Sequence, residues 1–144
     1  MFGPDEFKAR LLGVDELIGC TDEEFREIEL SAGFPLPKAY KDFMLIGGKK
    51  AGNFLRGWQS HYPKVVISSQ STKQFTSRFI NLPEPCFFFA NYNGDVALFF
   101  SNEGDDPPIY KPVSENGIDT YKQCACSFWN CIEELLKMYP IGCL

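Results

Sequence analysis

The sequence predicts an α+β fold: a single domain with a central, mostly antiparallel sheet, N-terminal helices and a C-terminal helix packed on it. Three patterns support this prediction: helical periodicity before residue 48, apolar strand-like runs around an Asn-Gly turn in residues 86–100, and an amphipathic stretch after residue 127. Helices, then strands, then one helix are typical of α+β rather than doubly wound folds. The 144 residues, 14 of them Phe, suffice for one domain with an aromatic-rich core.

Two helices are predicted before residue 34. Residues 5–12 can form a short opening helix, which Gly13 ends. The second helix begins at Thr21, because Thr followed three residues later by Glu24 is a capping-box pattern. Gly33 ends this second helix, since glycine readily adopts the left-handed conformation that stops a helix.

A third helix is predicted within residues 36–48. Pro37 lies where the first turn tolerates a missing N–H, and the pair Gly47-Gly48 predicts a left-handed stop. One face is apolar, because four residues recur with the spacing i, i+3, i+4, i+7: Tyr40, Phe43, Met44 and Gly47. We expect this face to pack under the sheet.

The pattern changes after residue 52. Residues 54–58 and 64–67 are short β-like runs with turn residues between them, so we expect two short strands there. Residues 71–80 are ambiguous: the four-residue spacing of Phe75 and Phe79 favours a helix, whereas the many Ser and Thr residues weaken that assignment.

The clearest strand prediction is a hairpin. Residues 86–90 and 95–100 flank a turn with Asn93-Gly94, which is the strongest short-range hairpin signal. Both runs are nearly all apolar, so we expect both faces to be covered and the pair to be central in the sheet. Prolines bracket residues 108–112, which predicts a further strand nearer an edge.

The last predicted helix begins after Ser127 and ends at Pro140. Its inner stripe is formed by Phe128, Cys131, Ile132, Leu135 and Met138 or Tyr139.

Charge is distributed unevenly along the chain, whose net charge is −5. Residues 1–34 carry −6, residues 35–80 carry +7 and residues 81–144 carry −6. A basic middle segment can bind an anion or nucleic acid. The alternative, which we favour because the basic residues are scattered, is that this segment folds against the two acidic flanks and is neutralised there.

The location expected from the sequence is cytoplasmic. No stretch approaches the ~20 apolar residues that span a bilayer, and residues 1–6 lack the basic and apolar regions of a signal peptide. The cysteines fit this location as small buried apolar residues, with no disulfide framework. They are Cys20, Cys86, Cys124, Cys126, Cys131 and Cys143.

Residues 36–43, Leu-Pro-Lys-Ala-Tyr-Lys-Asp-Phe, followed by the glycine pair, resemble the SMI/KNR-type SUKH superfamily. The second half has the same order of elements: an aromatic strand, a turn ending in Gly-Asp, a second strand, an acidic loop, a short strand and a Ser-Phe-x-x-x-Ile helix. The resemblance covers roughly residues 20–140 of a single domain expected to span residues 1–144. Family members often carry Asn before the glycine pair, where this chain has Ile46.

Most of that superfamily are bacterial immunity proteins that neutralise secreted toxins. The resemblance therefore implies a protein without enzymatic activity that binds a cognate toxin, of nuclease type, and occludes its active site. The alternative is a regulatory or scaffold interaction module, like the fungal cell-wall regulators that share this superfamily. We expect a monomer or weak homodimer with no nucleic-acid or membrane partner. The sequence does not name the toxin.

Catalytic chemistry has little support in the sequence. The chain has one histidine, His61, so a Ser/His/Asp or Cys/His arrangement would depend on it, and we expect this residue to lie in a surface turn. Asp105 and Asp106 can be taken for a metal or acid pair, but adjacent carboxylates beside Gly and Pro are usually solvated. We therefore predict no catalytic residue, no metal ligand and no cofactor.

Binding is expected to use acidic side chains. An acidic loop at residues 102–106 follows the second strand of the predicted hairpin, and we expect this strand to hold the loop rigidly. Glu115 and Asp119 can add to the negative electrostatic field of the loop. Tyrosine is enriched in binding hot spots. The alternative is that the acids only keep the protein soluble and that the tyrosines belong to the core. The predicted partner-binding residues are Tyr92, Asp95, Glu103, Asp105, Asp106 and Tyr110.

Overall fold

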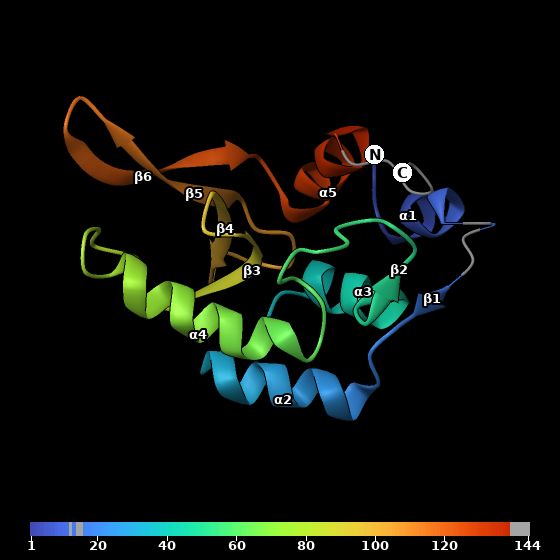
Figure 1. Ribbon diagram of the computed structural model, residues 1–144. Coiled ribbons are helices and arrows are strands. Elements are labelled where there is room, and N and C mark those ends of the chain that lie inside the picture. The colour runs from blue at the N-terminus through green and yellow to red at the C-terminus, as the bar shows by residue number, and fades with distance from the viewer. Residues whose placement is uncertain (12, 14–15, 139–144) are drawn as a thin grey trace.

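The computed structural model describes residues 1–11, 13 and 16–138, and it confirms the α+β class. The N-terminal half is mainly helical, and the strands of the main sheet follow it (Figure 1). In chain order the elements are α1 (Pro4–Arg10), β1 (Leu17–Ile18), α2 (Asp22–Ala32), α3 (Lys38–Gly47), β2 (Lys50–Ala51), α4 (Lys64–Thr76), β3 (Cys86–Tyr92), β4 (Val96–Ser101), β5 (Ile109–Glu115), β6 (Ile118–Ala125) and α5 (Phe128–Met138). The expected roles of Leu12, Tyr139, Pro140 and Cys143 fall on residues outside those described.

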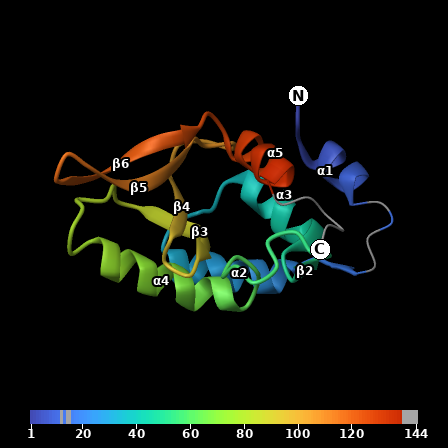
Figure 2. The same cartoon turned by 45° about the horizontal axis from the view of Figure 1, so that its top comes forward.

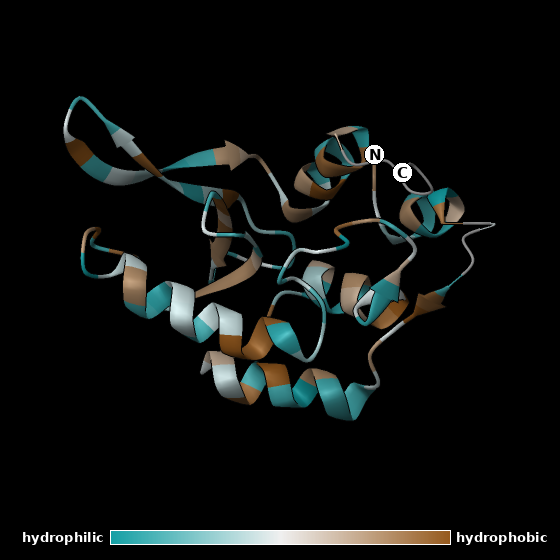
Figure 3. Ribbon diagram, in the orientation of Figure 1, coloured by the Kyte–Doolittle hydropathy of each residue, from teal (hydrophilic) through white to brown (hydrophobic). Residues whose placement is uncertain are grey.

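The main sheet is antiparallel, with the strand order β3-β4-β5-β6. The predicted hairpin is confirmed as β3–β4, but β3 is an edge strand, and β5 is internal because β6 pairs with it. We did not predict β6, whose side chains are mostly exposed and polar. Figure 3 shows this contrast, since β3 and β4 carry hydrophobic colours while the β5–β6 hairpin is largely hydrophilic. A solvated ribbon lacks the alternation that reveals a half-buried strand.

One face of the sheet packs on the main hydrophobic core, and α3 lies on the same side of the sheet (Figure 2). Tyr40 of α3 is fully buried, and the centroid of its ring lies 5.3 Å from that of Phe100 and 5.5 Å from that of Phe87. Phe128 of α5 closes the same cluster at 5.8 Å from Tyr40. The predicted apolar face of this helix is therefore confirmed as the face that packs against the sheet.

The other face of the sheet carries an aromatic row that crosses all four strands. Phe88 of β3 contacts Phe99 of β4 with ring centroids 4.9 Å apart, and Phe99 stacks on Tyr110 of β5 at 5.6 Å. Tyr121 of β6 is 5.7 Å from Tyr110. Phe99 of β4 and Tyr110 of β5 lie opposite each other in the strand pairing. The row therefore supplies much of the attachment of the β5–β6 hairpin.

Helix α4 covers the free edge of β3, where we expected a strand at residues 64–67. The Phe88 N–H donates to Ser69 Oγ at 2.9 Å, and the Asn91 side-chain amide donates to Thr72 Oγ1 at 2.7 Å. The Ser69 hydroxyl thus takes the place of a neighbouring strand's carbonyl group at Phe88, and the Gln59 N–H donates to the Asn91 carbonyl oxygen at 2.8 Å. This contact explains the many Ser and Thr residues of α4, and it overrides the β propensity of the Val-Val-Ile run.

The predictions for residues 54–58 and for the glycine pair at the end of α3 are wrong. Residues 54–58 form turns instead of a strand, because Leu55 and Gly57 have φ of 54° and 86°. Gly48 has φ of −66°, so the glycine pair is no left-handed stop. A Cβ at Gly48 would lie 2.8 Å from Cys20 Sγ, so this glycine permits close approach. The capping box of α2 and its left-handed Gly33 are confirmed.

Candidate partner-binding surface

The structure places the predicted partner-binding residues in two groups at opposite ends of β4. Tyr92 and Asp95 flank the β3–β4 turn, whereas Glu103 and Asp105 lie in the loop that follows β4. The six residues of β4 separate these ends by about 17 Å at the usual rise per residue. The acids therefore form no single cluster.

The acidic loop is held at both of its neighbouring helices. The Ala39 N–H at the start of α3 donates to the backbone oxygen of Asp105 at 2.9 Å. The Trp129 N–H in the first turn of α5 donates to Asp106 Oδ1 at 3.1 Å, so this carboxylate helps to cap the helix. Asp105 is exposed, and its side chain makes no hydrogen bond or ion pair with the described residues. Asp105 is thus presented by a fixed backbone.

Glu103 is tied to Tyr110 across the same loop. The Tyr110 hydroxyl donates to the Glu103 carboxylate, with oxygen–oxygen distances of 2.8 and 3.0 Å. Burial and the Glu103 carboxylate raise the pKa of Tyr110 to about 12. Because Tyr110 also belongs to the aromatic row, Glu103 is positioned by the sheet itself.

At the other end of β4, the β3–β4 turn is fixed by its own side chains. Asn91 Oδ1 accepts from the Gly94 N–H at 3.1 Å, and the Tyr92 ring lies 5.4 Å from that of Trp58. Tyr92 keeps 39% of its surface exposed, and Asp95 is exposed beside it. An aromatic ring and a carboxylate are therefore available together at this end.

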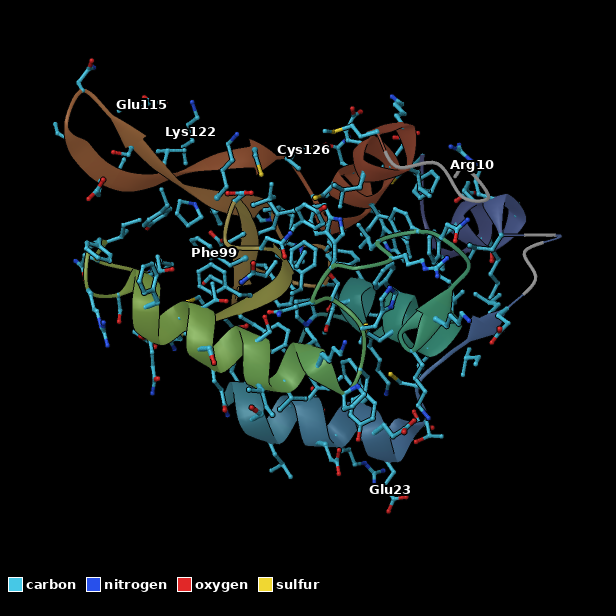
Figure 4. The ribbon with its side chains drawn as sticks, viewed as in Figure 1. Arg10, Glu23, Phe99, Glu115, Lys122 and Cys126 are labelled. Atoms are coloured by element: carbon cyan, nitrogen blue, oxygen red, sulfur yellow. The ribbon has the colours of Figure 1, made fainter. Side chains whose placement is uncertain are left out.

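A groove that the sequence did not predict lies between α4 and the β5–β6 hairpin, with a volume of about 540 Å³. Figure 4 shows the Phe99 ring on the side of the sheet that faces α4. The groove is lined by Asp95 and Asp119 and by the exposed rings of Phe75 and Phe79. The four-residue spacing of the two Phe residues favoured a helix over residues 71–80, but α4 ends at Thr76 and Phe79 lies in the turn after it.

Comparison with known families decides which family the chain represents. A model of the SMI1 / KNR4 family (SUKH-1) matches residues 19–134, which is most of the chain. This chain belongs to the SUKH-1 family. The match contains α2, α3, the whole main sheet and the acidic loop. SUKH-1 is widely linked to immunity proteins. No curated protein matches the chain.

Four of the eight basic residues in the middle segment of this SUKH-1 protein pair with acids of the flanks, as we expected, whereas Lys38 pairs with Asp42 inside the segment. Three lysines bind acids of the N-terminal flank and a fourth binds an acid that follows the segment. The pairs are Lys41–Asp22 at 3.8 Å, Lys49–Glu24 at 2.7 Å, Lys50–Glu16 at 2.8 Å and Lys73–Glu84 at 3.0 Å. These lysines are therefore not presented as a free basic stripe for a phosphate backbone.

His61 is partly buried in the SUKH-1 domain, in a bend of the loop before α4, whereas we expected a surface turn. Its Nδ1 and Nε2 lie 3.3 Å from the carbonyl oxygens of Gly48 and Phe54, respectively. Burial lowers the pKa of His61 from its ordinary value, although the surrounding carbonyl groups oppose this shift. His61 therefore connects the loop before α4 to the backbone at Gly48, where α3 ends, and to the backbone at Phe54.

Two further findings concern the residues that the structure describes. No group of three or more His, Cys, Asp or Glu side chains is arranged there to hold a metal ion. None of the described helices combines the length and the apolar character required to cross a membrane.

Of the described cysteines, Cys124 and Cys126 are exposed and three are buried, so the expectation of burial holds for Cys20, Cys86 and Cys131.

Proposed function

We propose that this SUKH-1 protein is an immunity protein that binds one cognate secreted toxin and neutralises it. The observation that supports the proposal is the family match over residues 19–134, in a family widely linked to immunity proteins. We further propose that the toxin is of nuclease type and that binding occludes its active site. A bound protein that covers the active site prevents the substrate from entering it and requires no chemistry of its own.

The charge of the chain supports this choice of toxin class. A nuclease presents a basic surface to the phosphate backbone of its substrate, and an acidic inhibitor is steered toward such a surface. The net charge is −5, and exposed Asp95 and Asp105 have no ion-pair partner among the described residues. Tyr92 can add an aromatic contact beside Asp95. Glu103 and Asp106 contribute charge while they also hold the loop in place.

We expect a toxin gene to lie beside the gene for this chain, and neutralisation is tested by co-expressing its toxin domain with this chain and purifying both proteins. We expect the toxin domain to stop growth when it is expressed alone, and this chain to restore growth. Size-exclusion chromatography with light scattering should then find a 1:1 complex. If the chain neither restores growth nor forms a complex, the proposal is wrong. If a pull-down from the native host instead recovers a signalling complex, a regulatory module replaces it.

The acidic loop is tested by charge reversal with a structural control. Asp105→Lys should slow association with the toxin about tenfold at low salt and flatten its salt dependence, because exposed charges act mainly on the association rate. Asp106→Asn keeps an oxygen acceptor for the Trp129 N–H, so it removes the charge without removing the cap. If both variants associate at the wild-type rate at every salt concentration, the acidic loop is not part of the binding surface.

A further inference from the structure

Two exposed phenylalanines have no place in either hydrophobic core: Phe75 in the last turn of α4 and Phe79 in the turn that follows the helix. Phe75 is 60% exposed and Phe79 is 58% exposed, and their ring centroids lie 5.3 Å apart. The side chains of α4 that are buried against the rest of the domain lie elsewhere on the helix: Val65, Ser68, Ser69 and Thr76. Adjacent exposed aromatic rings are typical of a surface that another molecule covers.

These rings line the groove between α4 and the β5–β6 hairpin, which is also lined by Ile80 and Pro112. Its volume of about 540 Å³ is within the range of ordinary ligand pockets. The groove has room for a few side chains of a partner but not for a folded domain. It is thus suited to a protruding loop or an extended segment.

Both walls of the groove are fixed before any partner arrives. Hydrogen bonds from Phe88 and Asn91 hold α4 against β3. The contact of Phe99 with Tyr121, whose ring centroids are 5.5 Å apart, holds the β5–β6 hairpin against β4. A preformed site avoids the cost of ordering its walls when it binds.

The charge of the groove is acidic. Asp95 and Asp119 line it, and neither carboxylate has a hydrogen bond or ion pair from its side chain within the described residues. No Lys, Arg or His lines the groove. Strand alternation places Lys111 and Lys122 on the other face of the hairpin, and Figure 4 shows Lys122 on the side away from α4. Apolar walls with two unpaired carboxylates complement a basic side chain that has apolar neighbours.

We propose that this groove binds a segment of the toxin in which a Lys or Arg side chain is flanked by apolar residues. The basic group lies near Asp95 and Asp119, and the apolar residues pack on Phe75 and Phe79. This inference rests on the proposed function, because it names the surface through which that function would be exerted. It assigns the centre of the contact to the groove, which lies at the Asp95 end of β4 and not at the acidic loop.

A peptide test examines the groove without the toxin. The tripeptides acetyl-Leu-Arg-Leu-amide and acetyl-Leu-Glu-Leu-amide are titrated to millimolar concentration into the ¹⁵N-labelled full chain. We expect the Arg peptide to shift the amide signals of Phe75, Asp95, Ala97 and Asp119, and the Glu peptide to leave them unchanged. The variant Asp95→Asn/Asp119→Asn should abolish these shifts. Absence of shifts with the wild-type chain, or equal shifts with both peptides, would overturn the proposal.

The toxin test compares matched variants by calorimetry with the purified toxin domain. Phe75→Ser/Phe79→Ser and Asp95→Lys/Asp119→Lys should each weaken the complex about 30-fold or more, as central hot-spot residues do. The controls lie elsewhere: Ile67→Ser removes another exposed apolar side chain of α4, and Glu23→Lys reverses an exposed charge on α2, which Figure 4 labels far from the groove. Both controls should bind as the wild-type chain does.

The two tests separate failure of this inference from failure of the proposed function. If the wild-type chain binds the toxin and the groove variants bind equally well, the groove is overturned while neutralisation stands. If the Arg peptide shifts the amide signals of the groove but the toxin domain does not bind, the groove binds basic segments and the proposed function is wrong. If the groove amides shift with protein concentration alone, the occupant is a second copy of this chain and the proposal is overturned.

Discussion

Tyr40 combines a fully buried ring with a hydroxyl that has no hydrogen-bond partner among the described residues. Burial raises the pKa of Tyr40 well above its ordinary value, so the group stays neutral. The surrounding side chains are mostly rings, including Phe87 and Phe100. Leaving a buried hydroxyl unpaired costs roughly 1–3 kcal/mol. A residue of the segment that resembles the family therefore leaves one polar group unsatisfied in the core.

Replacing this tyrosine tests the cost directly. Tyr40→Phe removes the unpaired oxygen and keeps the ring, so we expect the free energy of unfolding to rise by about 1 kcal/mol in a urea titration. Tyr62→Phe is the matched control: the Tyr62 hydroxyl donates to Glu27, so its removal should destabilise the domain. A loss of stability in Tyr40→Phe would mean that the hydroxyl is paired in solution.

Helix α4 acts as a substitute for a fifth strand of the main sheet. Its hydroxyl groups accept hydrogen bonds at the edge of β3, and α2 lies along its other side, where Gln70 Nε2 donates to Ser31 Oγ at 2.8 Å. Figure 1 shows the two helices side by side below the sheet. The hydrogen-bonding demand of the edge strand is thus met in part by the Ser69 side chain and in part by the Gln59 N–H, which donates to the Asn91 carbonyl oxygen at 2.8 Å.

Removing the Ser69 hydroxyl should show how much the edge of β3 depends on α4 for its stability. Ser69→Ala leaves the buried Phe88 N–H without its acceptor, so we expect a loss of roughly 1–3 kcal/mol in the free energy of unfolding. Hydrogen exchange of the Phe88 amide should accelerate together with the loss of stability. Ser71→Ala, at an exposed position of the same helix, is the control. Equal stability of the two variants would exclude the role of Ser69.

Elements with strong local signals could be predicted, and elements set by tertiary contacts could not. The capping box of Thr21 and Glu24 and the Asn93-Gly94 turn specify their structures within a few residues. By contrast, Val65 and its neighbours have β propensity, and only the contact with β3 makes them helical. The groove was missed for the same reason, since Asp95 and Asp119 lie far apart in sequence and line one groove only because of the tertiary fold.

At the scale of the whole molecule, buried titratable groups limit stability at both ends of the pH range. Burial lowers the pKa of His61 below 6.5, so the unfolded chain binds its proton more readily and stability falls as the pH drops below that value. Burial raises the pKa of the Cys20 and Cys86 thiols from 9.0 to about 11, so the unfolded chain ionises first and stability falls above pH 9.0.

We therefore expect the free energy of unfolding to be highest between pH 6.5 and 9.0, as measured by urea titrations at each pH. His61→Gln should flatten the acidic limb between pH 7 and 5 and leave the alkaline limb unchanged. Cys86→Ala should reduce the slope of the alkaline limb alone. The assignment is wrong if either variant keeps the full slope of its limb.

The two edges of the main sheet differ in one further respect. Helix α4 occupies the outer side of β3, whereas no described strand or helix pairs with the outer side of β6. New strands can therefore add to this sheet in one direction only. If two copies joined through β6, their pairing would bring together the two open edges and leave none for a third. Edge-to-edge association of native chains through the main sheet is thus limited to a closed pair, however high the protein concentration rises.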